Sequence, residues 1–245
     1  MTMVNLEQAP GPIELIKVLG VIATVSGVLI VGAYQMTAGA RSSNQQKARE
    51  AAVFQVVPGA TSYTEYALTA DTATAILGAE TTAPEGSHSV FVGYNASGAM
   101  AGIALEAGAQ GYSDIVHILY NYSPDCECVT GFTVLSSRET PGLGDKILKD
   151  AGFLANFKTP KNPGLDAKLN AEKSALANEI VTVKHGTKTH PWQVDAISGA
   201  TITSRAVGKG INQSAKMMLP LVAKHLEVMK TKPAAKNETE NKEVK

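Results

Sequence analysis

The sequence predicts an α+β protein made of a single N-terminal transmembrane helix followed by one folded domain. Three observations support this: an apolar run of about twenty residues near the N-terminus, several short β-rich runs bounded by turn residues, and a long helical pattern near the C-terminus. Short strands joined by tight turns favour a small antiparallel sheet with flanking helices. The expected parts are an N-terminal segment (1–14), a transmembrane helix (15–36), a linker and helix (37–60), the domain (61–230) and a disordered tail (231–245).

The apolar run covers residues 15–34 and carries one charge, Lys17. Twenty helical residues rise about 30 Å, which matches the hydrocarbon core of a bilayer. Small residues recur along this run at spacings of three and four, so they form a stripe on which another membrane helix could pack closely. The stripe consists of Gly20, Ala23, Thr24 and Gly27.

A cleaved signal peptide is the alternative to a retained anchor, because residues 38–40 (Ala-Gly-Ala) resemble a cleavage site. The length of the apolar run and the acidic Glu7 and Glu14 before it favour a retained anchor. Basic residues follow the run more often than they precede it, and the positive-inside rule alone would keep the domain in the cytoplasm. The residues after the run are Arg41, Lys47 and Arg49.

The elements of the domain follow from periodicity and turn chemistry. A helical pattern over 48–56 ends at Pro58-Gly59, and the last helix is expected from Thr203 to about Lys230, kinked at Pro220. Between them we expect a hairpin over 87–105 that turns at 95–98, strands over 115–122 and 129–135, a helix over 165–177 and a short strand over 180–183.

Composition excludes several functions. The net charge is zero, so nothing favours nucleic acid, whose binding requires clustered Lys and Arg. Cys126 and Cys128 are too few for an iron–sulfur cluster or a closed zinc site. They are interpreted as ordinary side chains or, in an oxidising compartment, a local disulfide. The five histidines lack metal-ligand spacing, so no metal is expected.

The most informative segment is Asp195-Ala-Ile-Ser-Gly-Ala-Thr-Ile-Thr-Ser-Arg205. It predicts a small, hydroxyl-rich turn leading into a helix, where Gly199 permits close approach of the backbone to a ligand. The free amides at a helix start form an anion site, and the hydroxyl of Thr201 would lie beside it. The alternative, which the pattern alone favours, is that Ser198 or Thr201 simply caps the helix.

This segment resembles the flavinylation motif of the FMN-binding domain family, in which an acidic residue precedes Ser/Thr-Gly-Ala-Ser/Thr. The resemblance implies that Thr201 carries FMN through a phosphoester and that residues 195–200 are recognised by a separate flavin transferase. It also implies that the neighbouring residues Ser198, Gly199, Ala200, Thr203 and Ser204 contribute to cofactor binding.

A second motif, Glu139-Thr-Pro-Gly-Leu-Gly-Asp-Lys-Ile147, is a Pro-Gly turn that can bring backbone close to a flat ligand. It resembles a signature run of the G subunit of Rnf electron-transport complexes and of the related C subunit of the sodium-pumping NADH:quinone reductase. The latter usually has glycine at the position of Asp145, which favours the Rnf protein. The implied role is a loop that lines the flavin, with the residues Thr140, Gly142, Leu143 and Gly144 near the ring.

The resemblance implies a membrane-anchored electron carrier with covalent FMN, one component of an ion-translocating ferredoxin:NAD oxidoreductase (Rnf) complex. The implied partners are the other membrane subunits, in the cell inner (cytoplasmic) membrane. The chain would be single-pass with its flavin domain extracytoplasmic, against the charge count. It is not expected to turn over a substrate alone, and no catalytic residue is assigned.

Three alternatives remain. One is a component like the C subunit of the sodium-pumping reductase. Another is an independent extracytoplasmic flavin reductase, for which Glu139, Asp145 and Lys146 are the candidate acids and bases. The least favoured is a non-redox assembly module.

Overall fold

The computed structural model describes residues 11–77, 81–159 and 162–233, and it divides into two compact units, Met1–Ala48 and Arg49–Lys245. The helix α1 (Pro12–Val56) begins in the first unit and ends in the second. Residues 37–47, expected as a linker, are therefore helical. The helix ends just before Pro58-Gly59 as predicted, and Gly59 has a φ of 82°. The expected tail lies outside the described residues from 234 onward.

The first unit is the part of α1 that contains the apolar run. In the described chain, α1 is long and apolar enough to cross a membrane. Its apolar side chains are exposed, as Ile16 and Leu29 illustrate at 69% and 66%. The Thr24 hydroxyl donates to the Gly20 carbonyl at 2.8 Å. Because this bond satisfies the hydroxyl within the helix, the small-residue stripe presents no unpaired donor to a bilayer.

The second unit contains an antiparallel sheet of seven strands within the described residues, in the order β2-β1-β3-β4-β5-β6-β7. The α+β class is confirmed, although the sheet is larger than the small one expected. The predicted hairpin is β3 and β4, and the two strands after it are β5 and β6; β1 and β2 were not expected. The bounds are β1 (Ser62–Leu68), β2 (Ala73–Ile76), β3 (His88–Tyr94), β4 (Met100–Gln110), β5 (Ile115–Ser123), β6 (Cys128–Ser136) and β7 (Leu165–Asp166).

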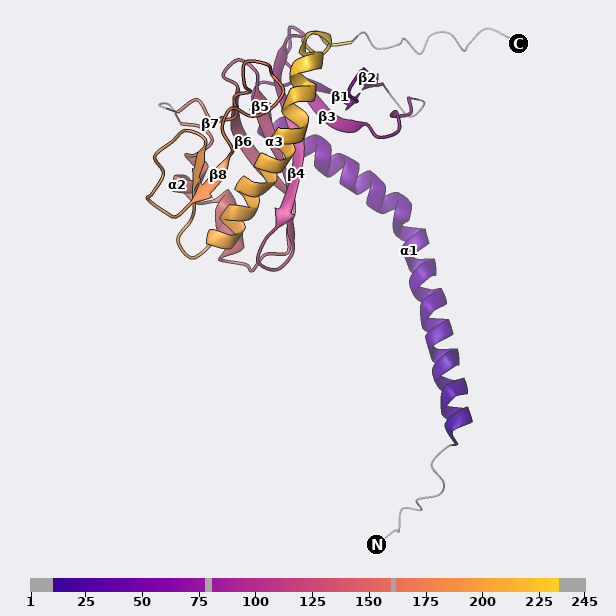
Figure 1. Cartoon of the computed structure of the whole chain (residues 1–245). Helices are drawn as coiled ribbons and strands as arrows, with labels where there is room; N and C mark the ends of the chain where they lie inside the picture. The colour runs from indigo at the N-terminus through magenta and orange to yellow at the C-terminus, as the bar shows by residue number, and fades with distance from the viewer. Residues whose placement is uncertain (1–10, 78–80, 160–161, 234–245) are drawn as a thin grey trace, which may run out of the picture. The chain divides into compact units, whose positions relative to one another are not determined.

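The long C-terminal helix α3 (Thr201–Met229) covers one face of this sheet and lies along β4 (Figure 1). Alternation along β5 sends Tyr120 toward α3, where its hydroxyl donates to Ser214 Oγ at 3.1 Å. The neighbouring Leu119 points to the opposite face and packs against Val53 and Val56 at the end of α1. The main core therefore lies between the sheet and α3, and it fixes the position of α3 on the sheet.

The segment between the sheet and α3 contains short elements. These are the 3-10 helix η1 (Gly144–Leu148), α2 (Ala151–Leu154), and the parallel pair β8 (Val181–Val183) and β9 (Gln193–Asp195). The helix expected over 165–177 is wrong. Leu165 instead pairs with Val129, and the Asn170 side chain accepts the Ser174 amide at 2.9 Å, closing a turn in which Lys173 has a φ of 54°.

Cys126 and Cys128 form a disulfide in the turn between β5 and β6. The residue between them, Glu127, has a φ of 49°. Of the two interpretations that the sequence left open, the structure contains the local disulfide.

Candidate functional site

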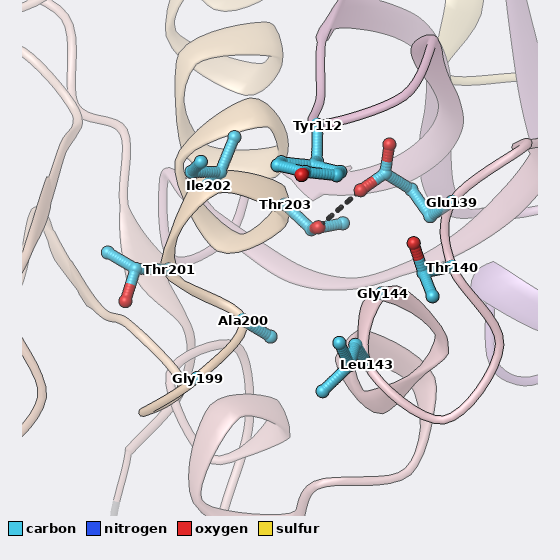
Figure 2. Close-up of a pocket in the computed structure, with 10 residues that line it drawn as sticks. All are labelled: Tyr112, Glu139, Thr140, Leu143, Gly144, Gly199, Ala200, Thr201, Ile202 and Thr203. Carbon is cyan, nitrogen blue, oxygen red and sulfur yellow. Dashed lines mark hydrogen bonds between the residues drawn. The ribbon is translucent and has the colours of Figure 1, made fainter.

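The two motifs meet at a cavity of about 580 Å3 beside the start of α3 (Figure 2). The cavity is lined by residues from the loop before β5, from the 139–144 loop and η1, and from the turn into α3. They are Tyr112, Glu139, Thr140, Leu143, Gly144, Gly199, Ala200, Thr201, Ile202 and Thr203. Segments far apart in the sequence therefore build one concave site, whose volume is typical of small-molecule pockets.

Most of the residues expected near a cofactor line this cavity: Thr140, Leu143, Gly144, Gly199, Ala200, Thr201 and Thr203. Three others lie elsewhere. Gly142 is exposed in its turn with a φ of 80°. Ser204 is buried, and its hydroxyl donates to Ala200 O at 2.9 Å and accepts from Ile197 N at 3.1 Å, which holds the turn into α3. Ser198 lines a second cavity of about 330 Å3, together with Lys146 and His185 among others.

The start of α3 leaves its first-turn amides available. Its N-cap residue is Ala200, and no side chain in the described part of the chain caps it. The capping alternative for Ser198 and Thr201 is therefore wrong. Gly199, with a φ of 79°, makes the preceding bend in a conformation that disfavours L side chains. An uncapped helix start with small residues beside it provides hydrogen-bond donors and a positive dipole end for an anion.

Thr201 lies at the edge of the cavity. Successive helix residues turn by about 100°, so Thr201 and Thr203 point to nearly opposite sides of α3. Figure 2 shows Thr203 directed toward Glu139 and Thr201 on the other side of the helix start. The Thr201 hydroxyl donates to Ile197 O at 3.2 Å, and the residue is partly exposed. Its oxygen is therefore reachable from solvent while its neighbours face the cavity.

Glu139 joins the parts of the site together. Its carboxylate accepts the Thr203 hydroxyl at 2.5 Å and the Ser113 amide at 2.9 Å. Burial raises the pKa of Glu139, but the hydrogen bonds from Thr203 and from the backbone outweigh it, so the pKa lies below its usual value. An added Cβ would lie 2.6 Å from its Oε1 at Gly111 and 2.3 Å from its Cβ at Gly144. Both glycines therefore make room for this side chain.

Tyr112 and Ile202 also line the cavity although neither was assigned to the site from the sequence. Together with Leu143 they form an apolar rim, with exposed fractions of 70% for Tyr112, 49% for Ile202 and 47% for Leu143. The sequence contains a feature that could have pointed to each of them: Ile202 lies inside the Thr201 motif, and Tyr112 follows a glycine just before a strand.

Asp195, the acidic residue of the motif, is held in place rather than free. Its Oδ1 accepts the Gly186 amide at 2.7 Å, which closes the turn after β8. The Asn156 side chain brackets the Asp195 backbone, accepting its N–H at 2.9 Å and donating to its carbonyl at 3.1 Å. Lys188 donates to the same Asn156 oxygen at 3.1 Å, and burial lowers the pKa of Lys188. This network fixes the end of β9 and hence the direction of the following residues.

Comparison with known proteins shows which proteins the domain resembles. Residues 111–216 match the family described as FMN-binding domain. The sequence is 34% identical over 132 residues to the G subunit of the Na(+)-translocating ferredoxin:NAD(+) oxidoreductase complex of Acetobacterium woodii, covering 54% of this chain and 55% of that one. It is 31% identical over 132 residues to the C subunit of the Na(+)-translocating NADH-quinone reductase of Pasteurella multocida, covering 53% and 45%. The chain spans about half the length of these curated relatives.

A longer match reaches the G subunit of the ion-translocating oxidoreductase complex of Cereibacter sphaeroides, 29% identical over 194 residues, 77% of this chain and 76% of the relative. Among solved structures, Shewanella oneidensis NqrC superposes with a TM-score of 0.51 at 20% identity, covering 69% of this chain and 85% of that one. This likeness establishes the fold. The resemblance to the Rnf G subunit and to the related C subunit of the sodium-pumping reductase is confirmed, and residues 111–216 resemble an FMN-binding domain.

Proposed function

We propose that this homologue of the Rnf G subunit is a membrane-anchored electron carrier whose FMN is joined through its phosphate to Thr201. One observation carries the proposal. The Thr201 hydroxyl lies at the uncapped start of α3, on the edge of a cavity lined by both motifs. A phosphate esterified there would lie beside the first-turn amides, and the attached ring could enter the cavity.

The cavity suits an FMN ring. Its rim is apolar, and Gly144 and Ala200 line it with little side-chain bulk, which lets a planar group approach the backbone. Thr140 supplies a hydroxyl group at an exposed lining position, whereas the Thr203 hydroxyl is bonded to Glu139. When bound, FMN supplies one- and two-electron chemistry, and the protein supplies position and electrostatic environment.

The covalent link is consistent with the local chemistry. The transferase would need an activated donor, a flavin dinucleotide: the Thr201 oxygen bonds to the FMN phosphorus, the pyrophosphate P–O bond breaks, and the nucleoside monophosphate leaves. The hydroxyl proton is released to solvent, so the hydrogen bond to Ile197 O is given up. Because Thr201 is partly exposed, a separate flavin transferase can reach it, while Asp195 and Asn156 keep the recognition segment in a fixed shape.

The relatives named above are subunits of ion-translocating complexes, and we propose the same setting here. The chain would carry electrons in a ferredoxin:NAD oxidoreductase complex and contact neighbouring membrane helices through the stripe that includes Gly20 and Gly27. The relative from Pasteurella multocida makes a component of a sodium-pumping NADH:quinone reductase the second candidate.

An independent flavin reductase fits less well. Such an enzyme needs a proton donor beside the flavin, and the hydrogen bonds described above lower the pKa of Glu139. A hydrogen bond from Lys149 likewise lowers the pKa of Asp145. Both carboxyl groups are therefore ionised at neutral pH and poorly suited to donate a proton.

We also propose that the flavin domain is extracytoplasmic. The Cys126–Cys128 disulfide supports this side, because disulfides persist in oxidising compartments. The basic residues after the apolar run argue for the cytoplasm, but a bias of a few charges is a weak determinant beside partner helices. A membrane-impermeant thiol reagent applied to intact cells after mild reduction should label Cys126, which is partly exposed, rather than Cys128, which is 2% exposed. Labelling only after permeabilisation, with an external control protein labelled throughout, would refute this topology.

The covalent link is tested with the full chain co-expressed with a flavin transferase. Thr201→Ala should lose in-gel flavin fluorescence after denaturation, and peptide mass spectrometry should find FMN on Thr201 in the wild type and no FMN on the corresponding peptide of this variant. Thr140→Ala is the matched control, because it removes another hydroxyl that lines the cavity. Thr201→Ser should retain the flavin, since the oxygen remains. If Thr201→Ala keeps its flavin fluorescence through denaturation, the assignment of Thr201 as the attachment site is wrong.

A further inference from the structure

Glu139 is the carboxylate among the residues that line the cavity, and no basic side chain of the described lining residues compensates its charge. None of the described lining residues is a Lys or an Arg. The nearest basic residue in sequence, Arg138, has a side chain 86% exposed and lies 3.7 Å from Asp114. Lys149 lies 2.6 Å from Asp145 and lines the second cavity. A negative charge therefore faces the space in which the flavin ring is proposed to lie.

The position of this carboxylate is fixed. It is bonded to α3 through Thr203 and to the loop before β5 through Ser113. Thr203 is itself buried at 3% exposure, and the close approaches at Gly111 and Gly144 leave little space for the Glu139 side chain to rotate away. The carboxylate is therefore a preorganised charge, which would not reorient when the charge of a neighbouring ligand changes.

We propose that the fixed charge of Glu139 lowers the midpoint potential of the bound flavin, an inference that rests on the proposed function. Full reduction transfers two electrons to the flavin, supplied by two equivalents of a one-electron carrier in succession or by one equivalent of a two-electron chemical reductant. Proton uptake from solvent balances this charge only in part, so the reduced ring carries more negative charge than the oxidised ring. A fixed carboxylate in a partly desolvated site opposes that charge more strongly than it would in water.

The charge of Glu139 persists at neutral pH because its hydrogen bonds hold its pKa below the usual value. It neither takes up nor releases a proton as the flavin cycles near pH 7. It therefore acts as a constant negative potential, which favours the oxidised flavin and makes the reduced flavin a stronger reductant.

The test is a spectroelectrochemical titration of the full-length flavinylated chain in detergent at pH 7. Glu139→Gln keeps the side-chain size and removes the charge. At a fixed potential it should raise the ratio of reduced to oxidised flavin at least tenfold, a positive shift of about 30 mV for a two-electron couple. Glu139→Asp, which retains the charge, should restore most of the low potential.

Glu179→Gln is the matched control. Glu179 is an exposed carboxylate paired with Lys216, which lies thirteen residues along α3 from Thr203. Thirteen helical residues span about 20 Å, beyond the Debye length at physiological salt. This variant should leave the potential unchanged. Should Glu139→Gln not fold, Thr140→Lys adds a positive charge at an exposed lining position and should also raise the potential.

Two results would overturn the inference and leave the proposed function intact. One is a flavinylated Glu139→Gln chain with a wild-type potential. The other is an equal shift in Glu139→Gln and Glu139→Asp, which would indicate lost geometry rather than lost charge. If the wild-type chain carries no flavin after co-expression with a transferase, both the proposed function and this inference fail.

Discussion

Gly144→Ala is expected to disrupt the site by crowding Glu139. The added Cβ would lie 2.3 Å from Glu139 Cβ, whereas carbon atoms in contact normally lie about 3.5–4 Å apart. The 139–144 loop must therefore shift by more than about 1 Å, carrying Glu139 away from Thr203. Overpacking of this kind costs about 1–3 kcal/mol of unfolding free energy. For a chain of this size, each kcal/mol lowers Tm by about 2–4 °C, so the expected decrease is about 2–12 °C.

The assay is thermal unfolding of the full-length chain in detergent, followed by circular dichroism. Gly131→Ala is the control, because an added Cβ there would meet no heavy atom of the described residues within 4 Å. Its Tm should equal or slightly exceed that of the wild type. If Gly144→Ala unfolds within a degree of Gly131→Ala, Gly144 is not required for space and the packing argument for the Glu139 contacts fails.

Three further outcomes are expected. Tyr94→Phe removes the buried hydroxyl that donates to Met229 O at 2.9 Å, and denaturant unfolding should show a loss of about 1–3 kcal/mol. Gly27→Leu should weaken co-purification with partner membrane subunits more than Val28→Leu does, since only Gly27 belongs to the small-residue stripe. The pKa of Glu139 is lowered in the folded state, so ionised Glu139 stabilises the fold at pH values above its unfolded pKa of about 4.3. This stabilisation is lost as the pH falls through the folded pKa. Glu139→Gln should therefore unfold more easily than the wild type at pH 7, and the difference should disappear in acid.

Local sequence patterns were sufficient to predict a helix or strand where the pattern agrees with the way the element is buried. The strands β3 to β6 are β-rich runs bounded by turn residues, and α3 has a continuous helical pattern after the Thr201 motif. The helix predicted over 165–177 is wrong because the apolar residues at helical spacing make other contacts in the fold. Leu165 joins the sheet edge beside Val129, and the Asn170 side chain closes a turn that competes with helix.

Only those parts of the site that consist of consecutive residues could be predicted from the sequence. The runs around Thr201 and Gly142 carry their chemistry in consecutive residues, so a motif identifies them. The role of Glu139 depends on contacts with residues 26 and 64 positions away, Ser113 and Thr203, which no short pattern encodes. The sequence contains glycines at the two positions where a side chain would crowd Glu139, Gly111 and Gly144. That these glycines make room for Glu139 is visible only in the folded structure.

The exposed apolar rim described at the cavity has a kinetic consequence. Tyr112, Leu143 and Ile202 leave the edge of the site open to the surroundings. Enzymes that must exclude water close a lid over the substrate, and opening that lid often limits turnover. A carrier with an open rim exchanges electrons without such a gate. Under the proposed function, the rate of electron transfer would be set by how often a neighbouring carrier docks against this face. Holding the partners in one complex would then raise this rate more than increased mobility of the loops would.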